Sequence, residues 1–210
     1  MEKELEIYYD HYKDSFSYLR QYLKQRDKYF MYSVILLSLV FFNSMLPADF
    51  EIISKEIIKN KIGIEEFGNL KLINSFLLFS LLSIVIKYFQ INLLIERQYS
   101  YLHHIEKRLS FKLKEFNIFR EGKAYLNQYP IFGNIVHRIY TIGFPFLLII
   151  LLLIKWRTSF LAEFKLVSFF SFDTIVIWLT IILTLFYLLW IHFKDFNSCN
   201  KKKNGVQQSV

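Results

Sequence analysis

The sequence predicts an all-α polytopic membrane protein with four transmembrane helices, cytoplasmic termini and an amphipathic helical stalk module in the cytoplasm. Hydrophobic residues make up 54% of the 210 residues and aromatic residues 19%, which exceeds the usual apolar content of soluble domains. The apolar residues gather in four runs near the length of about 20 residues that a spanning helix needs. Only six glycines and three prolines are present, which does not favour a loop-rich fold.

Each segment follows from the apolar runs and the charged stretches between them. In chain order we expect a cytoplasmic amphipathic helix (1–28), a first span (29–46), an outer loop (47–71), a second span (72–95), a cytoplasmic helix and loop (96–134), a third span (135–155), an outer interfacial segment (156–172), a fourth span (173–193) and a polar cytoplasmic tail (194–210).

Prolines and glycines set the expected breaks. Pro47 closes the first span, and a short helix from Phe50 to Asn60 is expected after it. Gly143 and Pro145 lie inside the third span and predict a kink there. The alternative, buried helices of a large soluble protein, is disfavoured because four such runs crowd into 210 residues.

The distribution of basic residues predicts the orientation. Segments 1–28, 96–138 and 194–210 contain 18 of the 26 Lys and Arg residues, whereas segments 47–71 and 155–173 contain seven. The positive-inside rule then places both termini in the cytoplasm. The abundance of Ile, Phe, Lys, Asn and Tyr is typical of AT-rich coding and indicates a bacterial inner-membrane protein.

The second span predicts a helix that leaves the membrane without a break. The stretch NLLIERQYSYLHHIEKRLSFKLKEF carries apolar residues at spacings of three and four among charged ones, which marks an amphipathic helix. No Pro or Gly occurs between Leu70 and Arg120. The apolar stripe, a candidate surface for an oligomer or a partner, consists of Leu102, Ile105, Leu109, Leu113 and Phe116.

The N-terminal segment has the same character and should run directly into the first span. Its stripe consists of Leu5, Tyr8, Tyr12, Phe16, Leu19, Leu23 and Phe30. The two stalks therefore need partners for their stripes. They can pack on each other within one chain, or pack on neighbouring copies or a soluble protein. The N-terminal stalk can also lie flat on the inner leaflet.

A few polar residues interrupt the spans and form a candidate intramembrane site. Lys87 lies about one turn inside the second span, where it either snorkels to the interface or faces a polar interior with Asn92. Asn74 and Asn43 lie toward the outer ends of the first two spans. Their amides are placed to hydrogen-bond across that hairpin.

The sequence contains no pattern that indicates catalysis. Sequences of the GxSxG, HExxH, P-loop and GxGxxG types are absent, and the one cysteine, Cys199, excludes a structural zinc site built on cysteines. We therefore expect no catalytic residue, cofactor or metal ligand. The basic inner loop follows helical periodicity without a nucleic-acid-binding module, so no nucleic-acid partner is expected.

The first 125 residues contain the motif SYLRQYLKQRDKYF before a two-span hairpin, and the motifs IERQYSYLHHIEKRLS and REGKAYL after it. This arrangement resembles the SLATT group of small bacterial membrane effectors. The resemblance implies an oligomer that compromises the membrane when a cytoplasmic sensor signals, as in anti-phage defence. A second hairpin from Phe132 onward departs from that two-span pattern. Four-span subunits of defence systems such as the Kiwa type are another likeness.

Three functions are consistent with these features. The leading one is a non-enzymatic, oligomeric effector or sensor subunit, which couples cytoplasmic helix packing to membrane permeability or signalling. Its partners would be the lipid bilayer, further copies of the chain and a cytoplasmic protein. The second is a channel or transporter subunit with a polar path near Lys87. The third is a lipid enzyme, for which Glu96, His137 and His192 are the candidates.

Overall fold

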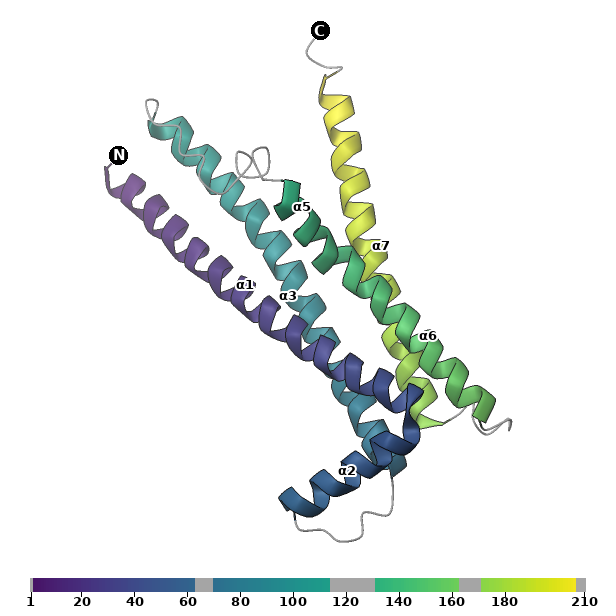
Figure 1. The fold of residues 1–210 in the computed structure, drawn as a ribbon. Coiled ribbons are helices and arrows are strands. Elements are labelled where there is room, and N and C mark those ends of the chain that lie inside the picture. Colours follow the sequence, from purple (N-terminus) through teal and green to yellow (C-terminus); the bar gives the residue numbers. More distant parts are fainter. Residues whose placement is uncertain (1, 63–69, 114–130, 163–170, 207–210) are drawn as a thin grey trace. The chain divides into compact units, whose positions relative to one another are not determined.

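The computed structural model describes residues 2–62, 70–113, 131–162 and 171–206, and these residues are helical, with no strand among them. The elements are α1 (Glu2–Met45), α2 (Pro47–Ile62), α3 (Leu70–Leu113), α5 (Ile131–Arg138), a π-helical turn η1 (Ile139–Gly143), α6 (Phe144–Ala162) and α7 (Phe172–Val206), as Figure 1 shows. The prediction of an all-α chain is confirmed for the part of the chain described.

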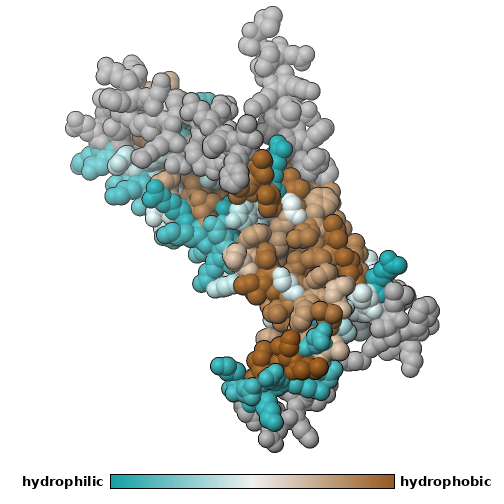
Figure 2. Space-filling view, viewed as in Figure 1, coloured by the Kyte–Doolittle hydropathy of each residue, from teal (hydrophilic) through white to brown (hydrophobic). Residues whose placement is uncertain are grey.

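Within the described residues, four helical segments are long and apolar enough to cross a membrane: Glu6–Met45, Leu72–Phe111, Ile135–Ser159 and Phe172–Ile191. This confirms four candidate spans and fits a multi-pass membrane protein. The face drawn in Figure 2 is hydrophobic over the apolar halves of the helices and hydrophilic along the charged half of α1. Many large apolar side chains of these helices are exposed, including Phe76 at 71% and Trp190 at 66%, as expected for surfaces that meet lipid.

The two stalks are continuous with their spans, as predicted. Each of α1 and α3 is a single helix of 44 residues, and neither contains a proline or glycine. Without a residue that breaks the hydrogen-bond ladder, nothing in the sequence stops either helix where hydropathy changes. The predicted extension of the second stalk from residue 114 to Arg120 lies outside the described residues.

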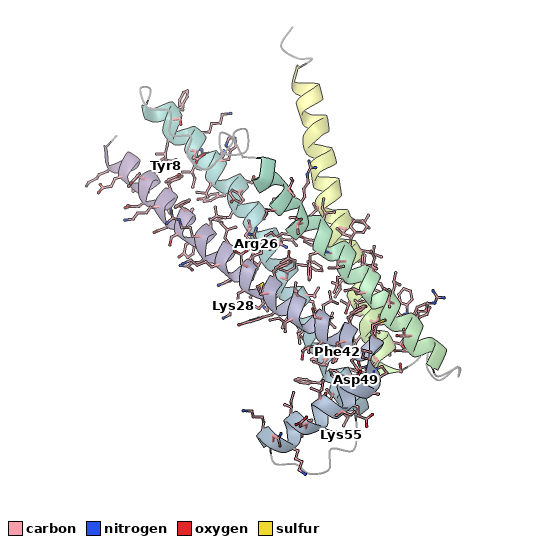
Figure 3. The ribbon with its side chains drawn as sticks, viewed as in Figure 1. Tyr8, Arg26, Lys28, Phe42, Asp49 and Lys55 are labelled. Carbon is pink, nitrogen blue, oxygen red and sulfur yellow. The ribbon has the colours of Figure 1, made fainter. Side chains whose placement is uncertain are left out.

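A sharp corner separates α1 from α2. Pro47 has no N–H to donate and favours the first position of a new helix, and α2 begins there. The Leu46 N–H donates to the Phe42 carbonyl at 2.9 Å, and the Phe50 N–H donates to the Leu46 carbonyl at 3.0 Å. The rings of Phe42 and Phe50 pack edge to face, 6.0 Å between centroids; Figure 3 labels Phe42 and Asp49 here. The expected helix from Phe50 to Asn60 is present but starts three residues earlier.

The third span contains a break in α-helical geometry where Gly143 and Pro145 predict one. The π-helical turn η1 ends at Gly143 and α6 follows. A proline cannot donate to the carbonyl four residues back and its ring crowds that carbonyl, and a π-turn relieves this. The Tyr140 carbonyl within this turn accepts a hydrogen bond of 2.6 Å from the Tyr88 hydroxyl. The guanidinium of Arg26, labelled in Figure 3, lies 4.3 Å from the centroid of the Tyr140 ring.

The last helix, α7, begins with an N-cap. The Thr174 N–H donates to Ser171 Oγ at 3.4 Å, which satisfies one of the free amides of the first turn. Helix α7 packs on α6, where the rings of Trp156 and Trp178 meet edge to face at 5.4 Å. It continues to Val206, beyond the predicted span. Residues 163–170 of the predicted interfacial segment lie outside the described residues.

The chain forms two compact units. The first unit comprises Met1–Ser33 and Ile84–Thr141, and the second comprises Val34–Ser83 and Ile142–Val210. The first unit therefore contains the charged halves of α1 and α3, and the second contains the outer ends of the four predicted spans. Each unit has its own buried contacts, which are described separately below.

Candidate functional site

The first candidate site is the contact between the charged halves of α1 and α3, here called the stalk contact. Its centre is a cluster of four buried apolar residues, Leu19, Ile91, Ile95 and Leu102, which are between 0% and 6% exposed. The partly buried residues that pack against them are Tyr12, Phe16, Tyr22, Leu23, Tyr29 and Tyr99. The predicted stripe of the N-terminal stalk supplies several of these, so the two stalks cover each other's apolar faces.

Polar groups at the stalk contact join the two helices at further points. The Tyr12 hydroxyl donates to Glu106 Oε1 at 3.4 Å, and Gln98 Nε2 donates to the Ser15 carbonyl at 3.2 Å. Glu106 is fully buried. Glu106 lies four residues after Leu102, which places it on the same face of the helix as the apolar stripe. The stalk contact thus contains an acidic residue as well as apolar ones.

The predicted stripe on α3 is already covered within a single chain. Leu102 is 0% exposed, Ile105 4% and Leu109 2%. The side chain of Leu113 and the whole of Phe116 lie outside the described residues. The described part of the stripe therefore matches the first alternative, packing within one chain. Contact with another copy or a partner remains a prediction, and it would need a surface other than these three residues.

The second candidate site is a polar network at the outer ends of the predicted spans, in the second unit. Asn43 Nδ2 of α1 donates to Asn74 Oδ1 of α3 at 2.8 Å. Asn74 Nδ2 in turn donates to Asp173 Oδ2 of α7 at 2.5 Å, and the Ser75 hydroxyl donates to Asp173 Oδ1. The predicted cross-bonding of Asn43 and Asn74 is thus present, and it extends to an acid that sequence reasoning did not single out.

A buried lysine completes this network, here called the outer polar network. Lys155 of α6 is 8% exposed and interacts electrostatically with Asp173. Asp173 also lies in the first turn of α7, where the helix dipole favours a negative charge. A buried charge is costly unless an opposite charge lies near it, so Asp173 offsets part of the cost of burying Lys155. The network links the ends of four helices that the predicted topology places at one membrane face.

Lys87 and Asn92 do not belong to this network. The Lys87 side chain is exposed, which matches the snorkelling alternative. Asn92 is 4% exposed and its side chain interacts with the Tyr88 hydroxyl. Two buried threonines of α7, Thr180 and Thr184, donate to carbonyls of their own helix at 2.7 Å. The four residues of the predicted intramembrane site therefore separate into one hydrogen-bonded pair, Asn43 with Asn74, and two residues in other environments.

No group of three or more His, Cys, Asp or Glu side chains among the described residues is placed to hold a metal ion. Of the residues considered for a lipid enzyme, His137 Nε2 lies 4.0 Å from Glu96 Oε1, while the side chain of His192 is outside the described residues. No protein-family model matches the chain, and no curated protein or solved structure is significantly similar to it. The resemblance to SLATT or Kiwa-type proteins therefore stays a prediction.

Proposed function

We propose that this chain is a non-enzymatic, oligomeric effector or sensor subunit of a bacterial inner membrane, with both termini in the cytoplasm. In this proposal, a change in the stalk contact alters the packing or permeability of the spans. One observation carries it: α1 and α3 each run unbroken from a charged half into an apolar half, and the charged halves share a buried core.

The continuity of the two helices is what makes this coupling physically reasonable. A helix without Pro or Gly has no identified point at which a kink is expected. About 18 residues of α3 follow Ile95, which at 1.5 Å each gives a lever of roughly 27 Å. A shift of one stalk against the other is therefore passed along the helix rather than absorbed at a hinge.

Burial at the stalk contact also indicates how much free energy a partner must supply to separate the two stalks. Burying a Leu or Ile side chain stabilises a contact by about 1.5–3 kcal/mol relative to exposing it in water. Leu19 and Leu102 are 1% and 0% exposed, and both lie outside the predicted spans. A partner that separates the stalks must supply a comparable difference in binding free energy between the two arrangements.

Contact between copies would use exposed side chains of the stalks. Large hydrophobic residues remain exposed there, including Ile7 and Tyr9, each at 57%. Exposed apolar groups of this size on a cytoplasmic helix are suited to protein contacts. Cross-linking in native membranes tests this part of the proposal, and finding only monomer with and without stress would contradict it.

Membrane potential in cells that express the full chain from a tightly controlled promoter tests the coupling. The test variant is Leu19→Asp, which places a charge in the buried stalk contact. The matched control is Tyr18→Asp, which makes the same substitution at the neighbouring, 55% exposed position. We expect a potential-sensitive dye to report depolarisation that changes with Leu19→Asp and with deletion of residues 2–28, but not with Tyr18→Asp. Equal potentials in all four strains and in the empty-vector strain would contradict the effector proposal.

A channel or transporter subunit is the second candidate, and the outer polar network is the observation that favours it. Polar and charged side chains that face each other within predicted spans mark solute paths in many membrane proteins, and here Asn74, Asp173 and the buried Lys155 do so. The network nevertheless joins helix ends rather than span centres, which ranks this candidate second. Ion flux into liposomes that contain the purified chain tests it, because Asp173→Asn should then change flux without abolishing insertion.

A further inference from the structure

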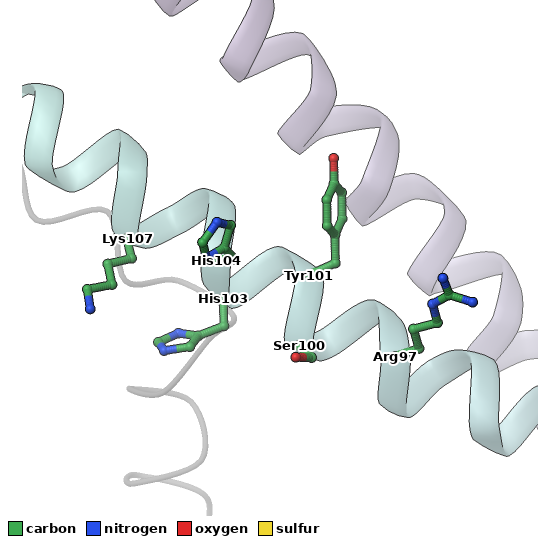
Figure 4. Close-up of a pocket in the computed structure, with 6 residues that line it drawn as sticks. All are labelled: Arg97, Ser100, Tyr101, His103, His104 and Lys107. Atoms are coloured by element: carbon green, nitrogen blue, oxygen red, sulfur yellow. The ribbon is translucent and has the colours of Figure 1, made fainter. Parts of the chain in front are cut away.

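A basic pocket lies on the cytoplasmic half of α3, in the first unit. It has a volume of about 550 Å³, and its lining side chains are Arg97, Ser100, Tyr101, His103, His104 and Lys107. Figure 4 shows these six side chains along consecutive turns of the helix. The lining thus combines two basic side chains with two imidazoles and two hydroxyls, and none of the described residues contributes a carboxylate to it.

The acidic residues of the same helical stretch are directed elsewhere. Glu96 lies 4.0 Å from His137, and Glu106 is buried and accepts a hydrogen bond from Tyr12. In contrast, Arg97 and Lys107 form no ion pair with any residue in the described part of the chain. The fold therefore separates the charges of this stretch, with the acids turned toward protein groups and the bases left facing the pocket.

The chemistry of the lining fits a phosphate group. A guanidinium offers paired N–H donors in a planar fork, and an ammonium offers a compact positive charge; both bind phosphate oxygens well. Tyrosine and serine hydroxyls add neutral donors. His103 Nδ1 is buried and has no hydrogen-bond partner among the described residues. Arg97 and Lys107 lie ten residues apart, about 15 Å along the helix, so one phosphate group would be held by one of these cations together with the hydroxyl or imidazole groups next to it. A cation or an apolar molecule would gain nothing from this lining.

The position of the pocket on α3 indicates which phosphate-bearing molecules can reach it. Arg97 is two residues beyond the end of the predicted second span at Ile95, or about 3 Å along the helix, and Lys107 is about 18 Å beyond it. The headgroup layer on one side of a bilayer is roughly 5–8 Å thick. The pocket therefore begins at headgroup depth and extends into the cytoplasm, where soluble molecules have access.

We propose that the pocket formed by Arg97, Ser100, Tyr101, His103, His104 and Lys107 binds a phosphate-bearing anion. Its source is either the headgroup of an anionic phospholipid or a soluble phosphorylated molecule, since both present the same oxygens to the same donors. This site goes beyond the proposed coupling function and does not depend on it, because binding can be measured without any change in membrane permeability.

Two binding measurements on the purified full-length chain in uncharged detergent test this site and separate the two sources. Isothermal titration with inorganic pyrophosphate measures the soluble source. Native mass spectrometry after incubation with phosphatidylglycerol or phosphatidylcholine counts retained lipids and measures the headgroup source. The test variant combines Arg97→Gln with Lys107→Gln. The matched control combines Lys13→Gln with Arg108→Gln, which removes the same charge from exposed positions of the two stalks that do not line the pocket.

We expect the wild-type chain and the control variant to bind one of the two probes alike. The pocket variant should bind that probe at least about tenfold more weakly, because it loses the charge-assisted contact whichever of the two cations holds the phosphate. Pyrophosphate binding would identify a soluble ligand, and selective retention of phosphatidylglycerol would identify a headgroup. The proposal is overturned if the wild-type chain binds neither probe, or if both variants weaken binding equally. Circular dichroism of each variant checks that the helices are retained.

Discussion

Replacing Leu102 by alanine is the sharpest test of the stalk contact. Leu102 is 0% exposed and lies in the cluster with Leu19, Ile91 and Ile95. Buried Leu→Ala substitutions cost about 2–5 kcal/mol because they lose transfer free energy and leave a cavity. We expect a cost near 3 kcal/mol for opening the stalk contact, since long helices can close only part of such a cavity.

Hydrogen exchange of the backbone amides of α3 is the appropriate assay, because it reports local opening rather than global unfolding. A loss of about 3 kcal/mol corresponds to roughly a hundredfold faster exchange at the stalk amides. The matched control is Phe111→Ala, which removes a larger side chain from the same helix at a position that is 84% exposed. The control should change exchange by less than about twofold, as expected for an exposed position.

Equal exchange in Leu102→Ala and the wild-type chain would refute this reasoning. An effect of Phe111→Ala as large as that of Leu102→Ala would also refute it, because the loss would then not depend on the burial of the side chain. Faster exchange in Leu102→Ala that spares the amides of the predicted spans would further show that the stalk contact opens as a local unit.

The remaining predictions concern polar contacts, and thermal unfolding of the purified chain in detergent measures all three. Asp173→Ala should lower stability by about 1–3 kcal/mol, since it leaves the Asn74 and Ser75 donors without their acceptor and removes the carboxylate that interacts electrostatically with Lys155; unchanged stability in Asp173→Ala would contradict this. Asn43→Ala should cost only about 0.6 kcal/mol, the average for hydrogen bonds between transmembrane helices, and a loss several times larger would show that its bond matters more than its geometry indicates. Tyr12→Phe should lower stability by about 1 kcal/mol or less, because its hydrogen bond to Glu106 is long at 3.4 Å. A larger loss of stability would show that this bond stabilises the stalk contact more than its length indicates.

Several features of the fold could be predicted because they depend on local sequence. Pro47 ends one helix and starts the next for steric reasons that act within a single turn. Pro145 similarly accounts for the interruption of the third span at Ile139–Gly143. The four spans follow from the length of the apolar runs, which reflects the thickness of a bilayer.

The candidate sites could be predicted only in part. The spacing of Leu102, Ile105 and Leu109 predicts a buried face, and all three are buried. It does not say what covers that face, because periodicity is the same for packing within a chain and between chains. Glu106 shares this face, but a charged residue there is accommodated only when a neighbour such as Tyr12 is brought to it from another helix.

For the outer polar network too, local sequence predicts some features and the fold decides the others. The sequence by itself determined that Asn43, Asn74, Lys155 and Asp173 lie near the ends of apolar runs, since position along a run is a local property. Only the tertiary structure decided that Asp173 accepts from Asn74 and stands opposite Lys155, because these partners are far apart along the chain. It also decided that Lys87 stays exposed while Lys155 is buried, because the cost of burying a lysine depends on whether the fold brings a carboxylate to it.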